Sequence, residues 1–171
     1  AGSDLEGGAG RFYMLATVTD QTNHSEESSV SLPVAQNAIV IDAVPESGKL
    51  RPGVENIVYI LCSYPDGTPA PSNLVVQLNS GQSYQLSTGE YGLAEFRFTP
   101  QNTYEFYITA QDAAGNYGEI RTNPTSDYQE ETILLRPERA TYRVGETMVL
   151  DILTSAQSGT AYLDIVREGQ T

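Results

Sequence analysis

The sequence resembles itself at one fixed offset, and this internal repeat constrains the fold more than any other feature. Residues 12–20 (FYMLATVTD) align with residues 104–112 (YEFYITAQD), and residues 44–53 align with residues 136–145 through a shared Pro-Glu and a shared Arg-x-Gly. Both alignments need an offset of 92 residues and no gap. A period of this length matches a seven-stranded β-sandwich and is far longer than a solenoid repeat. The sequence therefore predicts sandwich domains arranged in tandem.

The complete copy of the repeat is predicted to span residues 37–128. Seven short segments in it have the alternation or the apolar content of strands, and Gly, Pro and Asp-Gly turn signals separate them. These segments are residues 40–44, 57–63, 74–78, 84–86, 94–98, 104–111 and 117–122. No segment has a sustained helical period. The expected fold class is therefore all-β, an immunoglobulin-like antiparallel β-sandwich in a tandem array.

The flanking segments correspond to parts of the same unit. Residues 1–36 are expected to hold a linker and the last strands of a preceding domain, and residues 129–171 the first strands of a following domain. The chain is thus expected to be an excerpt of a longer multidomain protein. Half-sandwiches would expose apolar faces and unpaired strand edges. We accordingly expect strand exchange between chains, because the two flanks should leave the central domain from opposite ends.

The composition excludes several kinds of partner. The 22 Asp and Glu residues outnumber the 9 Lys and Arg residues, which gives a formal net charge of -13 and a pI near 4.2. Nucleic acids and anionic membranes repel such a chain. The hydrophobic fraction of 39% and the charged fraction of 18% are typical of a folded chain rather than of a disordered one. No apolar run reaches the length of about 18 residues that predicts a membrane-spanning helix.

Cysteine and histidine occur once each in this sequence. Cys62 lies in an apolar run at residues 57–62, so we expect a small buried side chain and no reactive thiol. His24 lies in a polar turn without the nucleophile or orienting carboxylate that a catalytic histidine needs. Asn23, His24 and Ser25 also form an N-glycosylation pattern, which chance alone would produce about once in such a sequence.

The acidic residues allow two interpretations. Asp20 and Asp112 precede the last hairpin turn of their copies, where Asp favours the turn geometry, and this is the favoured interpretation. The alternative is a calcium site at a domain joint that uses Asp42, Glu130 and Glu131. The acidic pairs near the predicted links, Glu26 with Glu27 and Glu130 with Glu131, are expected to be solvated charge. The sequence predicts no catalytic, cofactor-binding or metal-binding residue, hence no enzyme and no cofactor.

Several motifs, taken in order, resemble the alpha-2-macroglobulin family. Residues 136–147 (RPERATYRVGET) resemble the D-K-x-x-Y-x-x-G-E-T segment that opens macroglobulin-like domains. In the complete copy, residues 65–71 (PDGTPAP) precede residues 87–96 (STGEYGLAEF), as in that family. Residues 159–170 (GTAYLDIVREGQ) also fit the family. The resemblance implies the end of a third, a whole fourth and the start of a fifth macroglobulin-like domain.

The resemblance also implies a role and a location. Members of the family trap proteases: cleavage of a bait segment collapses a ring of such domains around the protease, and some members capture it through a Cys-Gly-Glu-Gln thioester. Neither device is recognisable here, since Cys62 is followed by Ser63 and Tyr64. The implied role is a structural scaffold whose partners are neighbouring macroglobulin-like domains and, through the intact protein, proteases. The implied location is extracytoplasmic (periplasmic, cell-surface or secreted), and the single cysteine favours a bacterial member.

Two other functions fit the same sequence. A bacterial surface protein built from tandem immunoglobulin-like adhesion domains would suit the turn at residues 112–116 (DAAGN). An accessory or carbohydrate-binding sandwich of a large secreted enzyme is the second alternative. Many further near-identical repeats in the full-length gene would favour the adhesion protein, and a catalytic domain would favour the enzyme.

Overall fold

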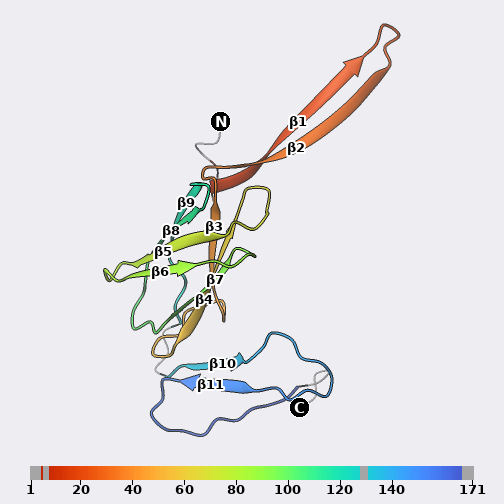
Figure 1. The fold of residues 1–171 in the computed structure, drawn as a ribbon. Coiled ribbons are helices and arrows are strands. Elements are labelled where there is room, and N and C mark those ends of the chain that lie inside the picture. Colours follow the sequence, from red (N-terminus) through yellow and green to blue (C-terminus); the bar gives the residue numbers. More distant parts are fainter. Residues whose placement is uncertain (1–4, 6–7, 128–130, 167–171) are drawn as a thin grey trace.

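The computed structural model describes residues 5, 8–127 and 131–166 (Figure 1), and no described segment forms an α-helix. The strands are β1 (Ala9–Thr19), β2 (Ser25–Ala35), β3 (Val40–Pro45), β4 (Asn56–Ser63), β5 (Ser72–Leu78), β6 (Ser83–Ser87), β7 (Leu93–Phe98), β8 (Phe106–Asp112), β9 (Tyr117–Thr122), β10 (Ile133–Pro137) and β11 (Leu150–Thr154). All strand pairs in the sheets are antiparallel. The expected all-β class is therefore confirmed. In the described part of the chain, no helix has the length and apolar character needed to cross a membrane.

Residues 37–127, here called the central unit, contain two sheets that enclose one core. One sheet has the order β3-β4-β7 and the other has the order β6-β5-β8-β9. Buried apolar side chains from both sheets form a single cluster, so the arrangement is sandwich-like. Each of the seven strands expected from the sequence is present, and no end differs by more than two residues from the expected one. Residue 128, the predicted end of the unit, lies outside the described residues.

Alternating side chains build this core. Every second residue of β7 and of β8 is buried, as the period of a half-buried strand requires. Phe96 and Phe98 of β7 stack with ring centroids 4.9 Å apart, and both make edge contacts with Phe106 of β8. Tyr84 and Tyr104 pack against the same aromatic group from its margins. The expected shared face of β7 is therefore confirmed, and it forms the centre of the domain.

Two glycines let backbone segments approach each other closely, Gly118 between the two sheets and Gly92 beside β4 within one sheet. A Cβ at Gly118 would lie 2.1 Å from the Ile39 carbonyl oxygen, and the backbone N–H of Ile39 donates to the Tyr117 carbonyl at 3.2 Å. Gly92 has a φ of +67°, and a Cβ there would lie 2.2 Å from the Cys62 carbonyl oxygen. Backbone approach this close is available only to glycine. Gly118 thus brings the start of β3 against β9, across the two sheets.

The N-terminal hairpin repeats the geometry of the last hairpin of the central unit. Every Cα pair of β1–β2 from Met14↔Val30 to Thr19↔Ser25, advanced by 92 residues in both partners, is a Cα pair of β8–β9. The turns match as well. Asp20 N–H donates to the His24 carbonyl at 3.0 Å, and Asp112 N–H donates to the Asn116 carbonyl at 3.1 Å. The repeat found in the sequence therefore has the same strand register in the structure.

The C-terminal hairpin repeats the first hairpin in the same way. Each of the Cα pairs of β10–β11, from Ile133↔Thr154 to Pro137↔Leu150, corresponds to a pair of β3–β4 at the offset of 92 residues. The equivalent bonds Glu46 N–H to Ile57 carbonyl and Glu138 N–H to Val149 carbonyl measure 2.9 and 3.0 Å. One expectation is not tested. The third strand of the repeat unit would correspond here to residues 166–170, and residues 167–170 lie outside the described residues.

The two hairpins leave the central unit at opposite ends. The β1–β2 hairpin extends away from the body, and the β10–β11 hairpin lies at the other end (Figure 1). The hairpin β1–β2 is also longer than β8–β9, with strands of 11 residues each against 7 and 6 residues. Most of the expected N-terminal linker lies outside the described residues, but Ala9 already belongs to β1.

Candidate functional site

Cys62 lies in the core, as expected. Its side chain is buried in β4. Burial, together with the negative charge of Asp42, raises the pKa of the Cys62 thiol to about 11. The thiol is therefore protonated at neutral pH and is a poor nucleophile.

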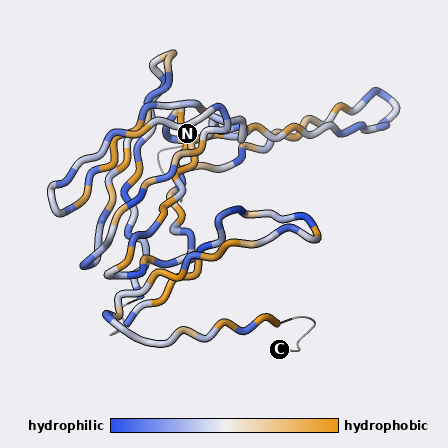
Figure 2. The backbone as a smooth tube through the Cα atoms, turned by 60° about the horizontal axis from the view of Figure 1, so that its bottom comes forward, coloured by the Kyte–Doolittle hydropathy of each residue, from blue (hydrophilic) through white to orange (hydrophobic). Residues whose placement is uncertain are grey.

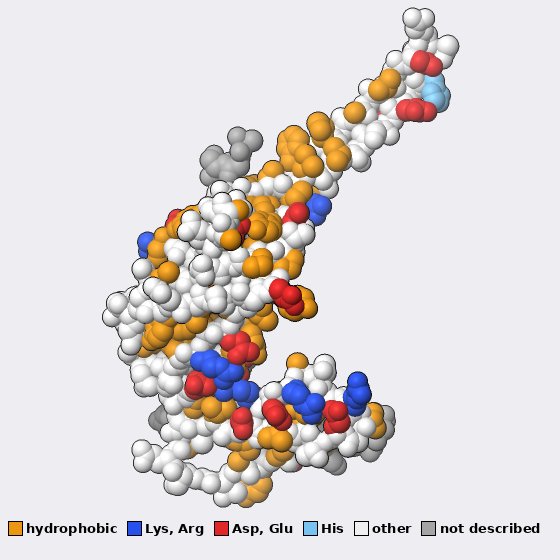
Figure 3. Space-filling model, viewed as in Figure 1, with side chains coloured by type: hydrophobic (Ala, Val, Ile, Leu, Met, Phe, Trp, Pro, Cys, Tyr) orange, Lys and Arg blue, Asp and Glu red, His pale blue; other side chains and the backbone are white. Residues whose placement is uncertain are grey.

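Asp20 and His24 lie in the exposed turn at the tip of the β1–β2 hairpin, where Figure 3 shows the histidine. The Asp20 carboxylate accepts hydrogen bonds from the hydroxyl and N–H of Thr22 and from the N–H of His24. These bonds lower the pKa of Asp20. Asn23 has a φ of 60°, which fits the left-handed position of this turn. Asp20 thus stabilises the turn through its side chain, which is the interpretation that the sequence favoured.

Asp112 has the same role, with an added link to the core. Its Oδ1 accepts the N–H groups of Ala114 and Asn116, both at 2.9 Å. Its Oδ2 accepts the Asn116 side-chain amide and the Tyr64 hydroxyl, both at 2.7 Å. The hydrogen bonds from Asn116 and from Tyr64 lower the pKa of Asp112. The hydrogen bond between Tyr64 and Asp112 also raises the pKa of Tyr64. Each oxygen of the carboxylate accepts two hydrogen bonds, from the turn and from Tyr64, which leaves it unsuited to a metal ion.

The structure does not gather the other acidic residues into a site. Asp42 is exposed on β3, Glu131 is exposed before β10, and both Glu26 and Glu27 are exposed on β2. Glu130 lies outside the described residues. Among residues 5, 8–127 and 131–166, no three His, Cys, Asp or Glu side chains are grouped closely enough to hold a metal ion.

The strongest polar cluster of the described chain is one that we did not predict. Arg136 of β10 reaches back to the central unit, where its Nε and Nη2 donate to Glu46 at 2.8 and 2.7 Å. The same guanidinium donates to the Glu55 carbonyl at 2.9 Å and to the Glu55 carboxylate at 3.3 Å. Arg97 reaches that Glu55 carboxylate from β7 at 3.5 Å. In Figure 3 the charged side chains gather where the hairpin meets the central unit. We call Arg136, Glu46 and Glu55 the joint cluster.

Two members of the joint cluster are largely enclosed, whereas the Glu55 side chain exposes 46% of its surface. The Arg136 and Glu46 side chains expose 14% and 10% of their surface. Burial opposes the charge of the Glu46 carboxylate, but hydrogen bonds from Arg136 and from the Ile57 N–H outweigh it and lower the pKa of Glu46. The hydrogen bonds to Glu46 in turn raise the pKa of Arg136. A two-pronged guanidinium–carboxylate pair fixes direction as well as distance.

Apolar and backbone contacts complete this joint. Leu134 and Thr132 are buried, although they belong to a hairpin that is otherwise exposed. A Cβ added at Gly53 would lie 2.9 Å from Cβ of Ser155, so the loop before β4 touches the end of β11. A cavity of about 470 Å³ lies beside the cluster, with Tyr59 and Glu95 on one wall and Leu135 on the other. One face of the β10–β11 hairpin thus rests on the central unit.

A signal for the joint cluster was present in the repeat. Position 136 corresponds to Val44 of the complete copy, so an arginine replaces an apolar residue at an equivalent strand position. Such a replacement indicates that this face of the strand packs against a different neighbour than the equivalent face in the complete copy. Its partner Glu46 is 90 residues away in sequence, and no local pattern connects the two.

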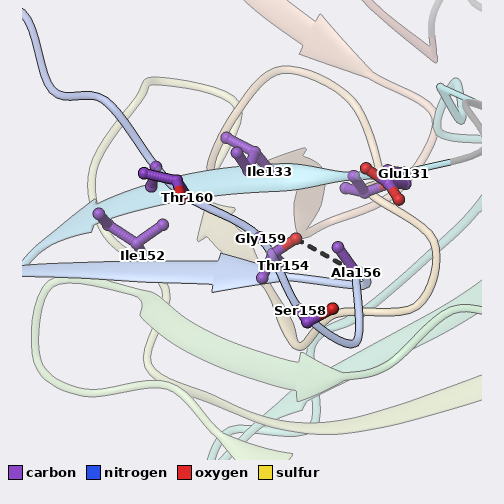
Figure 4. A pocket seen from close by; sticks show the side chains of 10 residues that line it. Glu131, Ile133, Ile152, Thr154, Ala156, Ser158, Gly159 and Thr160 are labelled. Carbon is purple, nitrogen blue, oxygen red and sulfur yellow. Dashed lines mark hydrogen bonds between the residues drawn. The ribbon is translucent and has the colours of Figure 1, made fainter.

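A second cavity, of about 270 Å³, opens on the other face of the same hairpin (Figure 4). Ile133 and Ile152 form its apolar floor, and the segment that carries Ser158 and Thr160 folds over one side. The Ala156 N–H donates to Thr154 Oγ1 at 3.1 Å and holds this segment in place. The cavity has the character of an unfilled core rather than of a polar substrate site.

Comparison with known proteins gives no assignment. No protein-family model matches the chain, and no curated protein matches it. The function proposed below rests on the internal repeat and on the joint cluster.

Proposed function

We propose that the chain is a non-catalytic scaffold segment of an alpha-2-macroglobulin-like protease trap, built from immunoglobulin-like macroglobulin domains in tandem. The observation that carries this proposal is the joint cluster. A hairpin equivalent to the first two strands of the central unit is attached to that unit by Arg136, at a fixed direction. This is the arrangement expected where one domain of an array ends and the next begins. The order of the sequence motifs supports the family.

In such a protein the segment would couple domains mechanically. Cleavage of a bait segment elsewhere would move the scaffold, and a joint held by a bidentate ion pair would transmit that movement instead of absorbing it. The partners would be the neighbouring domains and, through the intact protein, proteases. The acidic composition suits an extracytoplasmic scaffold in a bacterium.

A protease-entrapment assay on the intact protein tests this function. After cleavage by a protease, activity toward a large protein substrate should fall sharply, while activity toward a small peptide substrate should persist. The intact protein with the single substitution Arg136→Met should be cleaved by the protease to the same extent but should trap less of it. If the cleaved intact protein left the protease fully active toward large substrates, the proposal would be wrong.

The two equivalent turns favour one alternative, a tandem array of a bacterial surface or adhesion protein. Asp20 and Asp112 cap their hairpins with the same bonds, as a repeated module would. A full-length gene with many further copies of this unit, and without a thioester or a helical domain, would support the adhesion array over the trap.

A further inference from the structure

The four-stranded sheet of the central unit has all of its strands within this chain, and its outer face is polar. The sheet has the order β6-β5-β8-β9, and every second residue of β5 and of β8 is buried in the core. The alternate residues of these strands therefore point outward. Figure 2 shows hydrophilic and hydrophobic positions alternating along the strands of the central unit. This outer face does not depend on strands beyond the chain, because the second sheet that covers the inner face is present.

An open hollow of about 360 Å³ lies on this outer face. The outward side chains that line it are Asn73, Val75, Gln85, Thr109, Gln111 and Tyr117. Among the described residues that line it, none is charged, although the chain has 22 Asp and Glu residues and 9 Lys and Arg residues. A charged ligand would lose its water here without an opposite charge to compensate. The lining therefore favours a neutral, polar ligand.

The strand register places carboxamides and a tyrosine ring next to one another. Asn73 lies opposite Gln111, and Gln111 lies opposite Tyr117, so these three residues form one row across β5, β8 and β9. Gln85 lies in the neighbouring row, opposite Val75. Residues in directly opposite positions have Cβ atoms about 5 Å apart. The row is therefore continuous from the ring to the two carboxamides.

The carboxamides of Asn73, Gln85 and Gln111 are available to a ligand. All three residues are exposed, and within the described part of the chain none of these side chains forms a hydrogen bond with another residue. A carboxamide donates through its nitrogen and accepts through its oxygen, so it matches a pair of neighbouring hydroxyl groups. Three such groups around an uncharged hollow suit a ligand that carries many hydroxyl groups.

The Tyr117 ring is held in place at one end of the row. Its hydroxyl donates to Glu119 Oε2 at 2.7 Å, and the Tyr107 hydroxyl donates to the same oxygen at 2.6 Å. Tyr117 is nevertheless 41% exposed. A ring fixed at its hydroxyl loses little conformational freedom when a ligand binds, and its face is an apolar surface for the C–H groups of a sugar ring.

The equivalent row of the N-terminal copy lacks these groups. At the offset of 92 residues, Thr19 corresponds to Gln111 and Ser25 corresponds to Tyr117. The hydroxyls of Thr19 and Ser25 bond to each other at 2.7 Å. The ring and the free carboxamide are thus particular to the central unit and are not a general consequence of the hairpin geometry.

We propose that this hollow binds a neutral glycan, with one sugar ring against Tyr117 and its hydroxyl groups bonded to the carboxamides of Gln111 and Asn73. A cellulose-type chain of β-linked glucose is an extended, flat ribbon, which suits an open sheet face better than a coiled chain does. This inference concerns a surface of the complete unit and is independent of the protease-trap proposal. The entrapment assay does not involve this surface, so either proposal can fail alone.

An NMR titration of the isotope-labelled full chain with cellohexaose tests the proposal. Backbone amide signals around Asn73, Gln111 and Tyr117 should shift in a saturable manner, with a dissociation constant of about 0.1–1 mM. An oligogalacturonate of the same length, which carries a carboxylate on each ring, should cause no saturable shift. The proposal would be overturned by the absence of saturable shifts with cellohexaose up to about 5 mM, by shifts confined to another surface, or by equal binding of the two oligosaccharides.

Matched tyrosine substitutions test the contact with the ring. Tyr117→Ala removes the ring and should weaken cellohexaose binding about fivefold or more, whereas Tyr117→Phe keeps the ring and should stay within about threefold. Tyr91→Ala is the control and should leave binding unchanged, because Tyr91 is 77% exposed in the turn before β7 and does not line the hollow. Equal weakening by Tyr117→Ala and Tyr91→Ala, or by Tyr117→Ala and Tyr117→Phe, would overturn the proposal.

A second pair of variants tests the carboxamides. Gln111→Ala should weaken cellohexaose binding about threefold, because hydrogen bonds to the sugar are lost. Gln101→Ala, a matched change at an exposed residue of the loop after β7, should leave it unchanged. Full binding by Gln111→Ala would contradict the proposed contact. Thermal unfolding of each variant should match that of the unmodified chain, since the substituted side chains lie outside the core.

Discussion

At the scale of single residues, Arg136 fixes the C-terminal hairpin to the central unit more directly than any other described side chain. Arg136→Met keeps the aliphatic stem but leaves the Glu46 carboxylate largely enclosed without its partner. We expect this variant to weaken the attachment of the hairpin by about 2–3 kcal/mol, which hydrogen exchange of the β10 and β11 amides would measure. The control Arg139→Met breaks an exposed pair with Glu146, at 3.4 Å, and should cost less than about 0.5 kcal/mol. Equal exchange in the two variants would show that the joint cluster contributes nothing.

The protonation of Glu46 predicts how this attachment depends on pH. Because its hydrogen bonds lower the pKa of Glu46 below the ordinary value of 4.5, the ion pair stabilises the joint fully above that pH. The stabilisation is lost as the pH falls through the lowered pKa. Hydrogen exchange of β10 and β11 should therefore accelerate below about pH 4.5 in the unmodified chain, beyond the ordinary effect of pH on exchange. In Arg136→Met this additional acceleration should be absent, and its persistence would assign it to another carboxylate.

At the scale of elements, the two equivalent turns should differ in what they stabilise. Asp112 links the β8–β9 turn to Tyr64 in the central unit, whereas Asp20 serves only its own exposed hairpin. Asp112→Ala should lower the melting temperature of the central unit by about 5–10 °C, since several donors lose their acceptor. Asp20→Ala, the matched change in the other copy, should leave that temperature unchanged. Differential scanning calorimetry compares them, and equal shifts would contradict the distinction.

The elements that could be predicted are those specified by local patterns. The alternation in residues 94–98 and the Asp-Gly turn at Asp66 depend only on near neighbours, so the strands were placed within two residues. The joint cluster could not be predicted, because Arg136 and Glu46 meet only after the hairpin has taken its direction.

At the scale of the whole molecule, one folded unit carries two hairpins with exposed apolar side chains. Buried members of the main core cluster lie between Ile39 and Ala110, and neither hairpin contributes to that cluster. Burial of apolar surface is the main stabilising contribution, so the hairpins should depend on the central unit and not the reverse. A free two-stranded ribbon is marginally stable in water, which makes the exposed apolar side chains of β1–β2 costly unless another surface covers them.

This dependence predicts that residues 37–127 fold without the flanks. Their urea midpoint should lie within about 0.5 M of that of the full chain, and the m-value should be similar, because the slope reports the surface exposed on unfolding. A much lower midpoint would mean that Arg136 and Leu134 do more than attach a hairpin: the joint would then belong to the cooperative unit, and the boundary between the two copies would lie beyond it. The size of the midpoint difference therefore measures how much the contacts of Arg136 and Leu134 stabilise the central unit.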